Sequence, residues 1–312
     1  MTETVDATDG SARPTLAFVG AGRAGSALAL GLHSAGHRIV AVHSHTPRHA
    51  ARLAEATGAV VAPTAAQAAR QAAITFATVP DSQIVAVAAT IAASGMPLRG
   101  RALVHCSASS GPEVLAAARI TGASLGAFHP LQALAGPQSA RLLRGTTFTI
   151  EAAEPLVASL HALASDLGGH VLHVPPGSRG LYHAAAVLAG NAPLVLLARA
   201  TTLLEDAGVE PAQAHRGLVA LLAGAASNAL EAGPTAALTG PVMRGDAATV
   251  ARHLDVLAAD PGTRELYRRL GLEVVALAGL DGREQVADTL AAVVPGRPHR
   301  VGPSMVAHPR VA

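Results

Sequence analysis

Two histidines and an asparagine are the side chains of this 312-residue chain whose types and spacing best suit catalysis. His129 directly follows an apolar run, and Pro130 restricts the backbone behind it. His183 and Asn191 lie about two turns apart in a long helical pattern, so they share one face. Histidine, with an ordinary pKa of about 6.5, is a suitable general acid near neutral pH. We predict these three residues as catalytic; the alternative for each is a structural hydrogen bond in the core.

A glycine-rich segment matches the dinucleotide-binding pattern GxGxxG, with the residues Gly20, Ala21, Gly22, Arg23, Ala24 and Gly25. The apolar run Leu16–Val19 precedes it and the helical pattern Ser26–Ser34 follows it, which is the context that this pattern requires. Gly20 would permit a tight turn, Gly22 the approach of a pyrophosphate, and Gly25 close packing of helix on strand. The pyrophosphate would lie at the N-terminus of the helix. The alternative is a strand-to-helix turn that is glycine-rich for packing alone.

The loop after the second predicted strand distinguishes NAD from NADP. An NAD site places Asp or Glu there, about twenty residues further on, to bind the ribose 2′-hydroxyl. This segment has no carboxylate and offers instead Ser44, Thr46 and Arg48. Hydroxyls donate hydrogen bonds, and an arginine binds a phosphate through a charge-assisted fork. We therefore predict NADP(H) as the cofactor; the alternative for Arg48 is a solvated position on the next helix.

Further cofactor contacts are expected from loops at the carboxyl ends of the following strands, where open α/β sheets bind ligands. Val79, Pro80 and Asp81 follow one such strand, and Ser107 follows the next. We expect Val79 and Pro80 to pass beside the nicotinamide ribose. Asp81 is equally well placed to be the N-cap of a helix that begins at Ser82.

Several catalytic classes are excluded by what the chain lacks. All 23 residues counted as Lys or Arg are arginines, which excludes lysine Schiff-base chemistry and a P-loop lysine. The 15 histidines and the single cysteine form no ligand cluster with metal-binding spacing, so no metal site is predicted. The segment Ser107–Gly111 lacks the GxSxG nucleophile elbow, and hydrolysis is not expected.

The elements that position these residues follow an α/β pattern in the first half of the chain. Short apolar, often β-branched runs alternate with helical stretches from Thr15 to about Pro175. This alternation predicts a Rossmann fold, with a doubly wound and mostly parallel sheet. The predicted strands are Thr15–Val19, Arg38–His43, Ile74–Val79, Arg101–Cys106, Ser124–Phe128, Thr146–Ile150 and His170–Val174.

The second half of the chain is predicted to be an all-helical domain. Its helices are too apolar to be fully solvated, so they bury one another or a second copy, and we expect a homodimer through this domain. The expected boundaries are a disordered N-terminus at 1–14, an NADP-binding domain at 15–176, a helical substrate and dimerisation domain at 177–294, and a flexible tail at 295–312. The predicted helices are Ser178–Asp206, Glu210–Ala232, Ala247–Ala258, Pro261–Leu270 and Asp281–Val293.

Charge and composition limit the partners. The formal charge is only +2, and the arginines are scattered without interleaved aromatics, so we do not expect nucleic-acid binding. A single cysteine fits a reducing compartment. The N-terminus has no signal-peptide pattern, and apolar runs are broken before they reach membrane-spanning length. We therefore expect a cytoplasmic protein with a small-molecule substrate and no membrane partner.

Six segments from Thr15 to about Val294 carry a resemblance to known proteins: GAGRAG at 20–25, TVPD at 78–81, VHCS at 104–107, FHPLQ at 128–132, YHAAA at 182–186 and LTGPVMRGD at 238–246. In these segments the chain resembles the 6-phosphogluconate dehydrogenase-like reductases, a superfamily that includes ketopantoate reductase and pyrroline-5-carboxylate reductase. More narrowly, it resembles bacterial Rossmann-like proteins whose C-terminal half is a domain of unknown function.

The resemblance implies an active site in a cleft between an NADP-binding domain and a dimerising helical domain. In better-characterised relatives a lysine and an asparagine on the long interdomain helix act on the substrate carbonyl. This chain has no lysine. By resemblance, His183 would take the lysine's role and Asn191 would orient the substrate oxygen, or the substrate would be an imine that needs less acid assistance.

The predicted function is NADPH-dependent reduction of a small 2-oxo acid, most specifically ketopantoate (2-dehydropantoate) to pantoate in pantothenate synthesis. His183 or His129 would protonate the developing alkoxide. Arg244 would bind the substrate carboxylate, with Ser109 and Tyr182 as further substrate contacts; the alternative for Arg244 is a surface position beside Asp246. The alternative functions are an imine reductase of the pyrroline-5-carboxylate type and a non-catalytic NADP-binding regulatory or scaffold protein.

Overall fold

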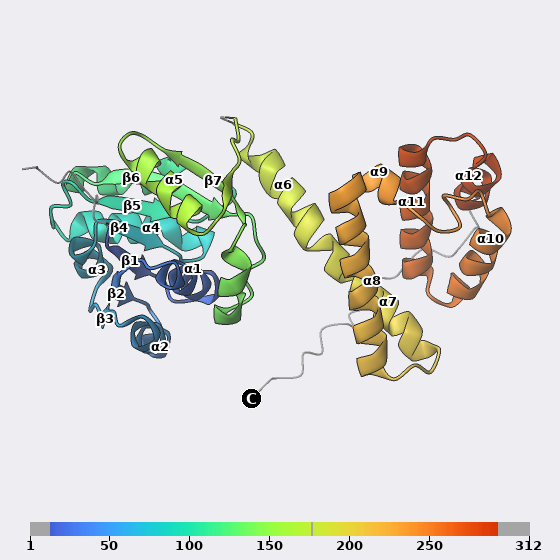
Figure 1. The fold of residues 1–312 in the computed structure, drawn as a ribbon, viewed down its shortest axis with the longest axis horizontal. Coiled ribbons are helices and arrows are strands. Elements are labelled where there is room, and N and C mark those ends of the chain that lie inside the picture. The colour runs from blue at the N-terminus through green and yellow to red at the C-terminus, as the bar shows by residue number, and fades with distance from the viewer. Residues whose placement is uncertain (1–12, 176, 293–312) are drawn as a thin grey trace, which may run out of the picture. The chain divides into compact units, whose positions relative to one another are not determined.

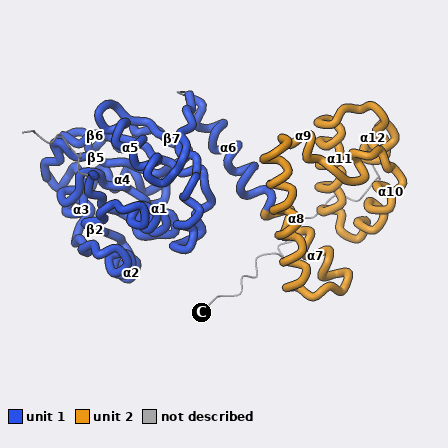
Figure 2. The backbone as a smooth tube through the Cα atoms, in the orientation of Figure 1, with its two compact units in different colours: residues 1–193 blue, residues 194–312 orange. Residues whose placement is uncertain are grey.

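The computed structural model describes residues 13–175 and 177–292. By internal contacts the chain divides into two compact units, residues 1–193 and 194–312 (Figure 2). This division falls within a helical run, beyond residue 176, and the domain boundaries expected from the sequence stay predictions. Most of the N-terminus and the tail expected to be disordered lies outside the described residues. Arg13 is described, and it donates a hydrogen bond to the carbonyl of Ala35, contrary to its predicted disorder.

The first unit is built on one eight-stranded sheet with the strand order β3-β2-β1-β4-β5-β6-β7-β8 (Figure 1). Every neighbouring pair is parallel except β6 and β7, which are antiparallel. This arrangement confirms the predicted Rossmann-type, mostly parallel sheet. The strands are β1 (Leu16–Val19), β2 (Ile39–His43), β3 (Val60–Val61), β4 (Ile74–Ala77), β5 (Ala102–His105), β6 (Ser124–Pro130), β7 (Thr147–Ala152) and β8 (His170–Val171).

Helices cover both faces of this sheet and close two separate hydrophobic clusters. Apolar side chains of α1, α2, η2 and α5 pack on one face. Apolar side chains of α3, α4 and η1 pack on the other. The helices of this unit are α1 (Arg23–Ser34), α2 (Pro47–Thr57), α3 (Ala65–Gln71), α4 (Asp81–Ala93), α5 (Leu156–Asp166), α6 (Arg179–Gly190) and the 3₁₀ helices η1 (Pro112–Thr121) and η2 (Pro137–Leu143).

All four phenylalanines of the chain lie in one row across the sheet. Phe18 stacks on Phe76 at 5.3 Å between ring centroids, Phe76 meets Phe128 at 5.7 Å, and Phe128 stacks on Phe148 at 4.7 Å. Each ring is fully buried. The row therefore ties strands β1, β4, β6 and β7 together through their side chains.

The second unit is entirely helical in its described residues. A small core of Val242, Val250, Leu254, Val275, Val286 and Leu290 joins its last helices. The predicted helix ends at residue 270, before Gly271, whereas the helix of the structure continues past this glycine. Gly271 is a close packing site against Leu290. The elements are α7 (Ala192–Asp206), α8 (Pro211–Ala232), α9 (Pro234–Ala237), α10 (Ala247–Val256), η3 (Leu257–Ala259), α11 (Pro261–Ala278) and α12 (Glu284–Ala291).

Several predicted limits differ from the structure. Strand β3 was not expected, because two residues are too few to show a period. Strand β8 ends at Val171, well before Val174. The predicted helix Asp281–Val293 begins at Glu284, and Val293 lies outside the described residues.

The helical run Arg179–Asp206 is apolar and has no buried residue. By length and composition alone it could cross a membrane, which the sequence analysis did not expect. An apolar helix that a second polypeptide covers has the same composition, so this property does not establish a membrane span. Large exposed apolar side chains along α6, α7 and α8 include Leu181, Leu188, Leu194, Val195, Leu221 and Leu230.

The phenylalanine row predicts where the first unit is most sensitive to truncation. We expect Phe128→Ala to lower the free energy of unfolding by about 3–5 kcal/mol, because it removes buried area and leaves a cavity between two rings. Val85→Ala on the exposed face of α4 should change it by less than about 0.5 kcal/mol. Urea unfolding followed by circular dichroism measures both. A Phe128→Ala loss no larger than the Val85→Ala loss would show that the row does not support the core.

Candidate functional site

The glycine-rich turn between β1 and α1 has the geometry of a dinucleotide cradle. Gly20 has φ +107°, a conformation that favours glycine. A Cβ on Gly25 would collide with the Gly20 carbonyl and the Thr78 side chain, so the helix can approach the strand only with glycine there. A Cβ on Gly22 would meet nothing within 4 Å, which leaves its backbone open to a ligand. No side chain caps the N-terminus of α1, so its free N–H groups fit a pyrophosphate.

Thr78, which follows β4, holds this turn in place. Its hydroxyl donates a 2.6 Å hydrogen bond to the Gly20 carbonyl, and its N–H donates to the Val19 carbonyl. The turn is thus anchored by a residue 58 positions away in sequence. From the sequence, Thr78 lies in the predicted strand Ile74–Val79 and in the TVPD segment, and no role was predicted for it.

A groove between α1 and α2 gathers positive charge beside the cradle. It has a volume of about 250 Å³. Arg23, His49 and Arg52 line it together with backbone and small side chains of the glycine turn, including Ala21 and Gly22. In the described part of the chain, none of these three cationic or titratable side chains has an ion-pair or hydrogen-bond partner. The groove therefore suits a phosphate group.

The three residues predicted for the 2′-phosphate lie at the start of α2. Ser44 accepts a hydrogen bond from the backbone N–H of Thr46, and Thr46 is the N-cap of the helix. Arg48 is exposed on the first helical turn and does not line the groove. Ala24 lies on the opposite side of the turn, in a cavity that extends toward β6.

Asp81 is not an N-cap, contrary to one of the two interpretations of the sequence. Pro80 precedes the helix, and Asp81 lies in its first turn. The Asp81 carboxylate accepts hydrogen bonds of 2.7 Å from the Ser107 hydroxyl and 3.1 Å from the Ser109 hydroxyl. The two predicted loops are thereby joined to each other, with Val79 half-buried beside them.

His105 fixes the loop that carries these serines. Its Nδ1 accepts from the Ser107 backbone N–H at 3.1 Å, and its Nε2 donates to the Gly111 carbonyl at 2.9 Å. The ring is fully buried, and burial lowers its pKa. His105 is therefore a neutral structural residue.

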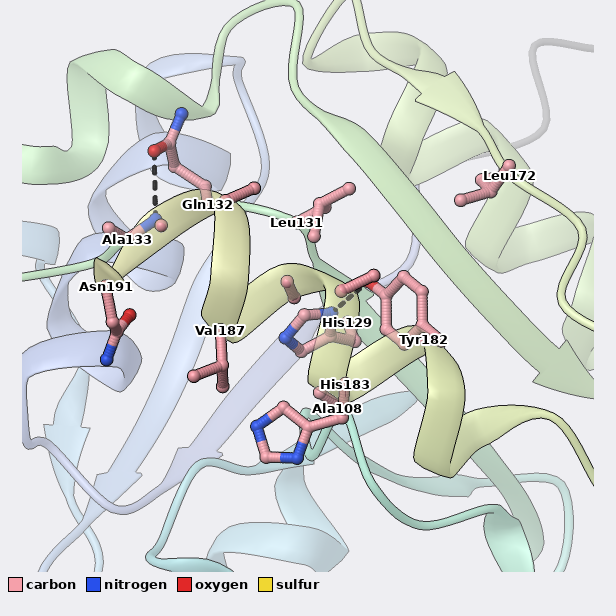
Figure 3. Close-up of a pocket in the computed structure, with 14 residues that line it drawn as sticks. Ala108, His129, Leu131, Gln132, Ala133, Leu172, Tyr182, His183, Val187 and Asn191 are labelled. Atoms are coloured by element: carbon pink, nitrogen blue, oxygen red, sulfur yellow. Dashed lines mark hydrogen bonds between the residues drawn. The ribbon is translucent and has the colours of Figure 1, made fainter. Parts of the chain in front are cut away.

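A pocket of the first unit lies beside His129, at the carboxyl ends of the parallel strands (Figure 3). Its volume is about 590 Å³. His129 and Gln132 line it and also line the smaller cavity that Ala24 and Thr78 border, so both residues lie between the pocket and the cofactor cradle. Most other lining groups are apolar. The polar lining side chains are His129, Gln132, Tyr182, His183 and Asn191.

His129 is bonded to Tyr182. The His129 Nδ1 and the Tyr182 hydroxyl are 2.7 Å apart, with the rings edge to face (Figure 3). Burial, with smaller contributions from the neighbouring His183 and Arg179, lowers the pKa of His129 to about 4. Burial also raises the pKa of Tyr182. At neutral pH both side chains are therefore uncharged.

Of the six residues predicted to be catalytic or to bind substrate, four line one pocket and two, Ser109 and Arg244, do not. His183, Asn191, His129 and Tyr182 all line the pocket. Asn191 caps the C-terminus of α6, where its exposed carboxamide has no hydrogen-bond partner among the described residues. Arg244 is exposed on a turn of the second unit, just before Asp246, the N-cap of α10. Ser109 lines a separate hollow with Arg179 and Glu151.

Two residues around Tyr182 were missed by the sequence analysis. Thr149 lies directly across from His129 in the antiparallel pairing of β6 and β7, and its hydroxyl lowers the pKa of Tyr182. Arg179 is three residues before Tyr182 on α6 and bonds the Glu151 carboxylate through Nε and Nη2. Helical spacing from Tyr182 could have indicated Arg179. Thr149 required the strand order.

Residues 15–109 match the family described as NADP oxidoreductase, coenzyme F420-dependent. The chain is an NADP-dependent oxidoreductase. Residues 146–274 of this oxidoreductase match DUF2520, a domain of unknown function, which confirms the resemblance found in the sequence. The cofactor prediction is confirmed at the level of NADP. No curated protein matches the sequence.

Solved structures similar to the oxidoreductase have the same fold. A protein assigned as an NADP oxidoreductase in Bacteroides fragilis is 27% identical, with a TM-score of 0.69 over 84% of this chain and 97% of that one. Protein TM1727 of Thermotoga maritima is 24% identical, with a TM-score of 0.62 over 84% and 98%. A pyrroline-5-carboxylate reductase of Streptococcus pyogenes is 14% identical, with a TM-score of 0.58 over 89% and 96%.

Substitutions of Thr78 and Thr75 test whether the Thr78 hydroxyl anchors the glycine-rich turn. Thr78→Val should lower the free energy of unfolding by about 0.5–1.5 kcal/mol, because it removes the bond to Gly20, and should weaken NADPH binding. Thr75→Val should be neutral or stabilising, because the Thr75 hydroxyl is buried without a partner. Urea unfolding and NADPH fluorescence titration measure the two effects. Equal NADPH affinity in both variants would contradict the anchoring role of Thr78.

Proposed function

We propose that this oxidoreductase uses NADPH to reduce the C=N bond of a small imine in the pocket beside His129. The observation that carries the proposal is the position of His129, which borders both the pocket and the cavity next to the cofactor cradle. Among the described residues that line the pocket none is an arginine, and its only titratable groups are two histidines and a tyrosine. Such a lining suits a substrate that is uncharged or cationic more than a carboxylate.

A 2-oxo acid, with ketopantoate foremost, is the second candidate. Its carboxylate needs a cation or several hydrogen-bond donors, and the pocket lining in the first unit offers no guanidinium. The exposed Arg244 of the second unit, which has no ion pair among the described residues, is the group proposed to bind it, and Ser107 and Ser109 could contribute hydroxyls. This candidate therefore depends on Arg244, whereas the imine candidate does not.

The chain's own residues would bind and orient both reactants. When bound, NADPH supplies a hydride to the substrate carbon. The free N–H groups at Gly22 and the start of α1 would hold its pyrophosphate. His183 and Asn191, both on the pocket wall, would orient the substrate nitrogen or oxygen. The pocket wall at Ala185, Ala186 and Val187 would give the substrate an apolar surface.

The absorbance of NADPH tests the substrate class. We expect purified oxidoreductase to oxidise NADPH faster with 1-pyrroline, which has no carboxylate, than with pyrroline-5-carboxylate, and to oxidise NADH more slowly than NADPH. Turnover of ketopantoate that Arg244→Gln abolishes would instead support the 2-oxo acid. Tight NADPH binding without turnover of any of these compounds would contradict both and favour the non-catalytic NADP-binding protein.

The groove between α1 and α2 is proposed to hold the 2′-phosphate of the cofactor. Arg52→Gln should raise the KM for NADPH by about 10-fold or more and leave that for NADH unchanged, because it removes one charge-assisted phosphate contact. Arg48→Gln, a matched change on the same helix but outside the groove, should have a smaller effect. A larger effect of Arg48→Gln would favour the loop of Ser44, Thr46 and Arg48 that the sequence indicates.

We also propose that a second copy of the chain covers the exposed apolar side chains of α6, α7 and α8, which makes the protein a homodimer. A cytoplasmic location, as the sequence predicts, is a separate proposal. The exposed leucines of these helices would be costly to leave in water. A solution mass equal to one chain would exclude the homodimer.

A further inference from the structure

The geometry points to Tyr182 as the proton source of the reaction, with His129 passing the proton from the phenol to the substrate and Thr149 and Arg179 stabilising the phenolate that remains. This inference rests on the proposed reductase function and specifies how its substrate nitrogen or oxygen is protonated. It differs from the sequence prediction, in which a histidine is itself the acid.

The contact between His129 and Tyr182 has the arrangement that a relay requires. The Tyr182 hydroxyl lies 2.7 Å from the His129 Nδ1. The other ring nitrogen, Nε2, faces away from Tyr182 (Figure 3). Nε2 bonds no group among the described residues. It is not among the buried polar atoms that lack a partner, and the ring lines the pocket. One nitrogen therefore meets the phenol and the other is available to a ligand.

The charge state of His129 excludes it as a stored acid. With a pKa of about 4, lowered mainly by burial, the ring carries no extra proton at pH 7. A neutral ring that accepts the phenol proton at Nδ1 carries its own hydrogen on Nε2. It can release that hydrogen to a substrate only if Nδ1 gains one at the same time, and the Tyr182 hydroxyl is the donor at that atom.

Two side chains, Thr149 and Arg179, act in the direction that stabilises a phenolate on Tyr182. Four buried side-chain polar atoms have no hydrogen-bond partner among the described residues, and two of them are Thr149 Oγ1 and Arg179 Nη1. Both of these side chains lower the pKa of Tyr182, against the larger raising effect of burial. An unpartnered buried donor is costly unless a state of the protein uses it. A negative charge on the Tyr182 oxygen is such a state.

The proton transfer balances. As the substrate carbon receives hydride, the π electron pair of its C=N or C=O bond moves to nitrogen or oxygen. That atom takes the hydrogen of His129 Nε2, so the Nε2–H bond breaks and a new N–H or O–H bond forms. His129 Nδ1 takes the hydrogen of Tyr182, whose O–H bond breaks. Solvent then gives one proton to Nε2 while Nδ1 returns its hydrogen to the phenolate, which restores the phenol and the first tautomer of the ring.

A second histidine–tyrosine pair provides a control within the same chain. His253 Nδ1 and the Tyr267 hydroxyl are 2.8 Å apart, and the rings are edge to face as in the first pair. Tyr267 packs against the core of the second unit and lines none of the four pockets described for the chain. Tyr267→Phe removes the same hydroxyl from the same kind of pair, away from the proposed reaction.

The kinetic test compares single and double variants with the best substrate of the panel. Tyr182→Phe should lower kcat by about 10²–10⁴-fold and leave NADPH affinity unchanged, whereas Tyr267→Phe should change kcat by less than about 2-fold. Thr149→Val should lower kcat about 10-fold. His129→Asn keeps an acceptor for Tyr182 but lacks the second ring nitrogen that would protonate the substrate. The double variant with His129→Asn and Tyr182→Phe should have the same kcat as Tyr182→Phe alone, because the two residues act in one proton transfer. A kcat of the double variant that is lowered by the product of the two single-variant factors would overturn the relay.

Isotope measurements distinguish proton transfer from a structural role. In mixtures of H₂O and D₂O, the rate of the unmodified protein should curve with deuterium content, because two protons move together. Tyr182→Phe should make the dependence linear. A linear dependence in the unmodified protein would overturn the relay even if Tyr182→Phe is slow.

A spectroscopic measurement keeps the inference independent of the proposed activity. In ¹⁵N-labelled protein with NADPH bound, His129 should show an unprotonated Nδ1 and a protonated Nε2 from pH 5 to 8. A charged ring at pH 7, or the Nδ1–H tautomer, would overturn the relay whether or not a substrate has been found. Failure of every substrate together with the expected tautomer would count against the proposed reductase function only.

Discussion

The alternation of side chains along β6 is the constraint on which the site depends. Phe128 is fully buried between two other rings, so the next residue, His129, must point to the opposite side of the sheet. The antiparallel pairing with β7 then sets Thr149 across from His129, and α6 brings Tyr182 to the same place. A shift of one residue in this register would bury the histidine and expose the phenylalanine. The core and the site are therefore fixed by the same strand.

Burial outweighs the nearby carboxylates in the electrostatics of this site. His105 and His129 both have lowered pKa values, and for both the largest cause is removal from water. The acidic groups nearby are already used: Asp81 accepts from two serines, and Glu151 pairs with Arg179. A site of neutral donors results, which favours proton transfer along hydrogen bonds over storage of charge.

The sequence predicted the glycine turn, the Rossmann-type sheet and the grouping of His129, Tyr182, His183 and Asn191, because each depends on local spacing or on strand ends meeting at one edge. It did not assign Thr78, Thr149 or His105 a role, because their partners lie on other strands or in a loop whose shape no period reveals. Asp81 was equally compatible with a cap and a ligand contact from its spacing alone; the helix begins at Asp81 itself, which excludes the cap, and the ligand contact stays a prediction.

Both tyrosines of the chain are bonded to a histidine, one in each compact unit, and the chain has no tryptophan. The tyrosine absorption and emission of the protein therefore come from two phenols, each bonded to a histidine. Each unit therefore carries a single tyrosine as an optical reporter. When one tyrosine is replaced, the remaining tyrosine signal comes only from the other unit.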